Sequence, residues 1–175
     1  MASYIPLEGL YLAKPLVPGK FAREHPMNYV RSFAAGESIP MGFAVQVSGD
    51  DPGICRKAYS NRAMVLGVAM FSPDTHETDY TTPAYLSGSA VGVGEGLIMV
   101  RCWEAVEVGD AVRMRITTSS SYLAGMFGKT SDTYKTVLLD PACAEWRTAS
   151  ASGVNETGLI AELFIKTPIV IETVD

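Results

Sequence analysis

The chain has 175 residues, of which 47% are hydrophobic and 19% are charged, so it is long enough for one complete core. Its net charge of −5 argues against a general nucleic-acid binder, which is normally basic. The sequence contains no run of about 18 uncharged apolar residues that would predict a membrane-spanning helix. The N-terminus also lacks the basic segment and apolar core of a signal peptide. We therefore expect synthesis in a cytosol, with no membrane and no direct nucleic-acid partner.

Residues 1–28 predict an extended arm. Four prolines recur in this segment, and proline removes a backbone donor and excludes regular helix. The segment is nevertheless rich in apolar and aromatic side chains, so it needs a surface to lie on, either its own body or a neighbour. We hypothesise that it leaves its own body. The side chains expected to form this interface are Tyr4, Leu7, Leu10, Tyr11, Leu12, Leu16 and Phe21.

Residues 29–175 predict a single β domain. Short runs of β-branched, aromatic and aliphatic residues are separated by glycine, proline and serine, and no run keeps a 3.6-residue apolar stripe beyond two turns. The pattern is typical of an all-β fold, either a compact sandwich or a barrel-like, jelly-roll-like body. Residues 51–63 leave room for a helical turn, and residues 119–135 predict a loop or irregular hairpin.

Two Gly-acid pairs, Gly36-Glu37 and Gly109-Asp110, each precede an alternating apolar run, at residues 43–48 and 112–116. Glycine can adopt a positive φ, and an acid is tolerated in turns. Successive side chains of a strand point to opposite faces. Each pair therefore predicts a tight turn followed by a half-buried strand.

The expected core combines these runs with later apolar strands. Three isolated cysteines, Cys55, Cys102 and Cys143, form no Cys-x-x-Cys pair, so we expect small core residues rather than a metal or redox site. The other residues that we expect to be buried are Val45, Val47, Val68, Ile98, Val100, Val112 and Leu163.

The sequence offers little that predicts chemistry. The spacing of Asp74, His76, Glu77 and Asp79 matches neither a calcium-binding EF-hand loop nor a zinc-protease helix, so we expect a solvated polar loop without a metal. The glycine-rich stretch at residues 88–96 leads into a strand, whereas a dinucleotide site needs such a loop to open a helix. No Gly-x-Ser-x-Gly elbow is present. We therefore expect no cofactor, no catalytic residue and no enzymatic activity.

The succession of elements carries a resemblance. "AAGESIPMGFAVQVSGDDPG" gives a turn and a strand, "MVLGVAMFS" a further strand, "VEVGDAVRMRI" the second turn and strand, and "LIAELFI" a closing strand. Over residues 33–166 this order resembles the structural cement, or decoration, proteins of tailed bacteriophages. The resemblance implies a virion protein made in the host cytoplasm and bound to the capsid exterior. There it would cross joints between major capsid subunits and hold the shell against the pressure of packaged DNA.

The resemblance also implies that the chain binds other copies of itself and the major capsid protein. Such proteins often occur as trimers or dimers, so we predict a homotrimer, with a dimer as the alternative, and an arm that lies on an adjacent cement subunit or on the capsid. Two other functions stay open. The chain could be another phage head or tail structural β-protein. It could also be a small β-barrel enzyme or carbohydrate-binding β-module, with Trp103 or Trp146 as a sugar platform.

Overall fold

The computed structural model describes residues 16–23, 25–49, 51–61, 64–72, 84–119, 122–152, 158–166, 169 and 171–174. Regular structure in these residues is strand throughout, which confirms the predicted all-β class. The described part of the chain has no helix that could cross a membrane. The strands are β1 (Tyr29–Ala35), β2 (Ile39–Pro40), β3 (Ala44–Ser48), β4 (Asp51–Lys57), β5 (Val65–Ala69), β6 (Ala84–Tyr85), β7 (Ala90–Cys102), β8 (Arg113–Arg115), β9 (Phe127–Gly128), β10 (Thr136–Leu139), β11 (Ala144–Trp146), β12 (Ala151–Ser152), β13 (Leu159–Ile165) and β14 (Ile171–Val174).

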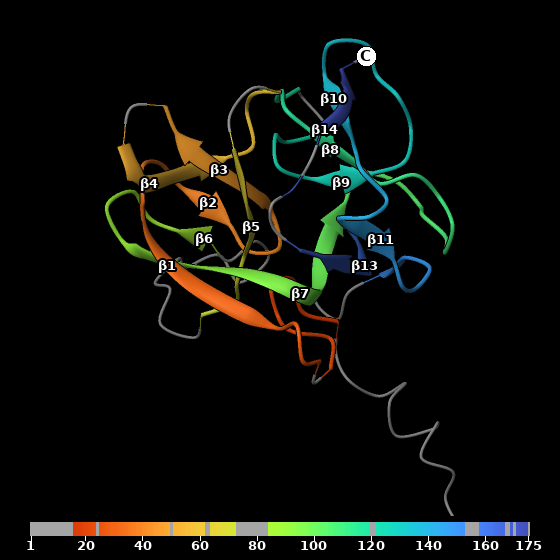
Figure 1. Cartoon of the computed structure of the whole chain (residues 1–175), viewed down its shortest axis with the longest axis horizontal. Helices are drawn as coiled ribbons and strands as arrows, with labels where there is room; N and C mark the ends of the chain where they lie inside the picture. The colour runs from red at the N-terminus through yellow and green to blue at the C-terminus, as the bar shows by residue number, and fades with distance from the viewer. Residues whose placement is uncertain are drawn as a thin grey trace, which may run out of the picture.

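The 13-residue strand β7 belongs to two lobes, which lie side by side in Figure 1. Its first half, residues 90–95, pairs with β1 on one side and with β5 on the other. Strand β5 pairs with β3, β3 with β4, and β4 with β1, so these pairings close a ring. This ring is the first lobe, and its closure accounts for the barrel-like character expected from the sequence.

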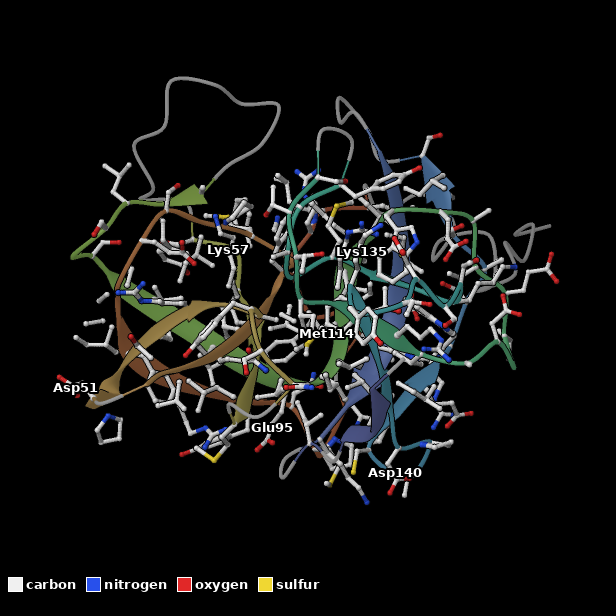
Figure 2. All side chains as sticks on the ribbon, turned by 90° about the horizontal axis from the view of Figure 1, so that it is seen from above. Asp51, Lys57, Glu95, Met114, Lys135 and Asp140 are labelled. Atoms are coloured by element: carbon white, nitrogen blue, oxygen red, sulfur yellow. The ribbon has the colours of Figure 1, made fainter. Side chains whose placement is uncertain are left out.

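The second half of β7, residues 96–102, begins the second lobe. It pairs along its length with β13, which also carries β11 and β12. Cys102 pairs with Phe127 of β9, from which the sheet continues through β8 and β10 to β14. The largest hydrophobic cluster fills this lobe and extends to β3 and β5. Met114, labelled in Figure 2, lies inside it.

The predicted core is largely confirmed. Val45, Val68, Ile98, Val100, Val112 and Leu163 are buried, as are all three cysteines, whereas Val47 is only partly buried. The glycine-rich stretch leads into a strand, as expected, and its residues 90–96 already belong to β7. It allows close packing, because a Cβ on Gly67 of β5 would collide with the carbonyl oxygen of Gly94.

The prediction of half-buried strands after the two turns is wrong in detail. Strand β3 is buried on both faces, because Ala44 packs into the larger cluster and Val45 into the ring's own cluster. Gln46 is therefore fully buried, and its side-chain oxygen accepts hydrogen bonds from the N–H groups of Tyr59 and Ser60. On β8, Arg115 is also buried.

The Gly109-Asp110 turn is confirmed, whereas Gly36-Glu37 lies in a bend without a positive φ that leads into β2, and a separate turn at Met41 and Gly42 precedes β3. Gly109 has a φ of +94°, which favours glycine. Asp110 accepts the Glu107 N–H at 2.8 Å, and Glu37 accepts the N–H of Lys57 at 2.9 Å. Residues 51–57 are strand β4 rather than a helical turn. Residues 119–135 contain only β9 as regular structure within their described part, in line with the predicted loop or irregular hairpin.

Candidate interaction surfaces

Residues 16–22, here called the strap, lie on the chain's own second lobe. The Gly19 N–H donates to the Met99 carbonyl at 2.7 Å, and the Ala22 N–H donates to that of Leu97 at 2.9 Å. Phe21 forms a bridge with Ile98, and Leu16 packs against a cluster of Ala22, Leu97, Met99 and Ile160. For Leu16 and Phe21, the apolar surface expected from the sequence is therefore the chain's own sheet.

Close backbone packing fixes the strap. Gly19 has a φ of +79°, and a Cβ there would lie 2.6 Å from the nitrogen of Phe71. The Phe71 N–H in turn donates to the Gly19 carbonyl at 2.9 Å, and the Lys20 ammonium lies 4.5 Å from the Phe71 ring centre. The other five predicted interface residues belong to residues 1–15, here called the leading segment, which lies outside the described residues.

Strand β1 has an open edge on the first lobe. Its partner β4 contacts it only at Ala34 and Ala35, so Tyr29–Phe33 pair with β7 alone among the described strands. Residues 51–53 of β4 cannot extend the pairing, because Pro52 lacks an N–H and the Gly53 N–H donates to the Asp51 carboxylate at 2.8 Å. Figure 1 shows β1 along the lower border of the first lobe. Figure 2 shows Asp51, the first residue of β4, at the outer end of the same lobe.

A second exposed surface surrounds Tyr134, between β9 and β10. Its side chain is 79% exposed, and its φ of 61° lies in the left-handed region that a bulky residue rarely adopts. The turn is anchored by Asp132, whose carbonyl accepts the Lys135 N–H and whose carboxylate lies 3.3 Å from the Arg115 guanidinium. Arg115 also lies 5.4 Å from the ring centre of Tyr122, which is itself exposed.

A carboxylate brace holds the loop after β9 against the end of β7. Glu104 accepts hydrogen bonds from the N–H groups of Lys129 and Thr130 and from the Thr130 hydroxyl, at 2.6 to 2.8 Å. Partial burial raises the pKa of Glu104, but these bonds together outweigh burial and hold that pKa below its ordinary value. The Lys129 ammonium lies 3.0 Å from the Asp110 carboxylate and lowers the pKa of that carboxyl group.

The model of a family described as "Structural cement protein (E217 gp24/Pam3 gp6)" matches residues 10–163. The chain belongs to this family of phage structural cement proteins. It is therefore a structural protein of a phage virion with a capsid-stabilising role, as the resemblance implied.

One solved structure shows the same fold. A chain in "The capsid of Myoviridae Phage XM1" matches with a TM-score of 0.66 and 15% identity, over 88% of this chain and 92% of that one. A chain in "The crystal structure of head fiber gp8.5 N base in bacteriophage phi29" matches with a TM-score of only 0.37 and 14% identity, over 82% of this chain and 98% of that one. No curated protein matches the chain.

The cysteines and tryptophans that were candidates for a chemical or binding role are packed inside the fold. Burial raises the pKa of the Cys55 thiol to about 11 and that of Cys102 to about 12. Trp146 is fully buried, and Trp103 packs flat against Gly128. The described residues contain no group that could hold a metal ion, and the segment of Asp74, His76, Glu77 and Asp79 lies outside them.

Proposed function

We propose that this cement protein binds the outer surface of the capsid, crosses joints between major capsid subunits and holds the shell against the pressure of packaged DNA. The family match carries this proposal, because residues 10–163 include the strap and nearly all of both lobes. The likeness to a chain of the XM1 capsid supports attachment to a capsid rather than to a tail. The role requires no catalytic group, and we propose that the chain is not an enzyme.

The protein acts as a homotrimer in this proposal, and a dimer is the alternative. The support comes from the leading segment, where Tyr4, Leu7, Leu10, Tyr11 and Leu12 are concentrated in 15 residues. Burial of a large apolar side chain contributes about 1.5 to 3 kcal/mol, whereas ordering a residue costs roughly 1 to 2 kcal/mol. The segment is therefore favourable to order only on a sizeable surface, and we assign that surface to a neighbouring subunit.

The capsid contact is the surface around Tyr134 in this proposal. A left-handed backbone at a bulky residue costs on the order of 1 to 3 kcal/mol and is found mainly at functional positions. The side chain of Tyr134 extends into solvent, so burial on its own chain does not compensate for that cost. Replacement by alanine should weaken capsid binding at least tenfold, while replacement of Val108, which is also exposed, by alanine should not.

Binding to purified capsids tests the proposed function. The protein should co-sediment with expanded capsids and not with unexpanded precursor shells, because the joints it crosses form on expansion. Equal binding to both shells would favour another head component, and binding to tails alone would place the chain elsewhere in the virion. Sedimentation equilibrium of the free protein distinguishes a trimer from a dimer.

A further inference from the structure

The open edge of β1 presents unpaired backbone groups in a defined direction. The Ala35 N–H donates toward β7, to the Ser89 carbonyl, whereas the Gly36 N–H donates to the Cys55 carbonyl on β4. Backbone groups of a strand alternate in direction, so those of Val30 and Ser32 point away from β7. In the described structure, no strand receives them.

The side chains at this edge do not protect it. Edge strands are normally shielded by charged residues, proline or bulges, because an open edge pairs with any available strand. Here Met27 is 47%, Tyr29 56% and Val30 43% exposed, and the only charge is that of Arg31. The Arg31 guanidinium turns back to the Leu66 carbonyl at 2.9 Å and packs over Phe33, so it does not stand in front of the edge.

The leading segment contains one run suited to this edge. Pro6 and Pro15 border residues 7–14, which hold no proline, so every residue of that run keeps its N–H. Its Tyr11 is a good strand former, and Leu10 and Leu12 are apolar side chains that suit contact with exposed Tyr29 and Val30. An added strand would place apolar side chains over both faces of the edge, because Tyr29 and Val30 point to opposite faces.

The position at which the strap begins favours a second chain as the source of the strand added to β1. The Val17 N–H lies 3.4 Å from the Met99 sulfur, whereas Arg31, at the centre of the open edge, pairs with Val93. The six residues from Val93 to Met99 span roughly 20 Å of strand. Tyr11, near the centre of residues 7–14, lies six residues before Val17, and six residues reach about 20 to 22 Å only when fully extended. The chain's own run would therefore meet this edge without any slack, whereas a run from a second copy carries no such constraint.

We propose that the open edge of β1 (Tyr29–Phe33) receives residues 7–14 of a second copy of this chain as an added β-strand. This inference rests on the proposed self-association and specifies where the leading segment binds. Main-chain hydrogen bonds from Val30 and Ser32 supply affinity, and Tyr29 and Val30 pack against Leu10 to Leu12. Each copy thereby links its second lobe, through the strap, to the first lobe of its neighbour.

Cross-linking of two single variants tests this pairing. Tyr11→Cys protein is mixed with Ser32→Cys protein on particles that lack the cement protein, and a short bis-maleimide is added. The three native thiols are buried, with raised pKa values at Cys55 and Cys102, and they should not compete. We expect a linked dimer with the linker between residues 11 and 32, and no such product when Ala105→Cys, at an exposed site of the second lobe, replaces Ser32→Cys.

A backbone variant checks that the link reports strand addition. Val30→Pro removes an outward N–H without touching the ladder to β7, and it should lower the cross-link yield at least tenfold, whereas Val30→Ala should not. An undiminished yield with Val30→Pro would overturn the proposal. A link within one chain of the Tyr11→Cys/Ser32→Cys double variant would also overturn it. Attachment of the two single variants to particles without any cross-linked product would do the same. If the protein did not attach to particles, the proposed function would fail, and the same mixture in solution would still decide the strand addition.

Discussion

The two halves of β7 belong to one strand but pack against their neighbours in different ways. The first half, residues 90–95, carries glycines that let β1 and β5 approach closely. The neighbouring strand β1 has an open edge along Tyr29–Phe33. The second half, residues 96–102, is buried almost throughout and is covered on both sides, by β13 and by the strap. The comparison shows how one strand can stabilise a body at one end and leave a pairing surface at the other.

The largest effect is expected in the second half of β7. Val100 is fully buried in the main cluster, so Val100→Asp places an unpaired charge in the core at a cost of several kcal/mol and should prevent folding. Circular dichroism and solubility would show this. Val108→Asp, at an exposed site of the same lobe, is the control and should fold normally. A folded, soluble Val100→Asp protein would contradict the assignment of this half to the core.

Close approach in the first half predicts a smaller but clear effect. Gly67 has a φ of +138° and its Cβ position faces the backbone of Gly94, so Gly67→Ala should lower the free energy of unfolding by about 3 kcal/mol. Gly88→Ala provides the matched control, because Gly88 also has a positive φ but no atom lies near its Cβ position. It should lose only about 1 kcal/mol. Equal losses in urea unfolding would show that contact with Gly94 is unimportant.

Truncation separates the strap from the leading segment. Removal of residues 1–15 should leave the melting temperature of the isolated chain unchanged and weaken self-association. Removal of residues 1–22 also deletes Leu16 and Phe21 from the second lobe and should cost on the order of 2 kcal/mol after the entropy of ordering is subtracted. If both truncated proteins melted at the same temperature as the full chain, the strap would not belong to the body.

The smallest effect concerns acid stability of the second lobe. The pKa of Glu104 is lowered in the folded chain, so its contribution to stability is present above its unfolded pKa and is lost as the pH falls through the folded value. Glu104→Gln should cost about 1 kcal/mol at pH 7, through weaker hydrogen bonds from Lys129 and Thr130, and progressively less as the pH falls below the unfolded pKa. Urea unfolding from pH 7 to pH 3 checks this. A loss of equal size at both values would rule out the carboxylate charge as the cause.

Local pattern was enough to predict the all-β class, the Gly109-Asp110 turn and most of the core, because alternation and turn chemistry depend on neighbouring residues. It did not predict the burial of Gln46 or Arg115, since their partners Ser60 and Asp132 lie 14 and 17 residues away. The ring depends on the short contact of β1 with β4, which no local signal specifies. The arm composition indicated a need for an apolar surface, but only the fold divides it into a strap and a leading segment. The strained Tyr134 carried no signal in sequence.

The central claim is that this protein stabilises a phage capsid, and heat-induced DNA release from particles tests it most directly. Particles made without the protein should release DNA at a lower temperature than complete particles, and addition of purified protein should restore the difference. Protein lacking residues 1–15 should restore it only in part, because the lobes would bind without linking to one another. A release temperature that is the same with and without the protein would contradict the account.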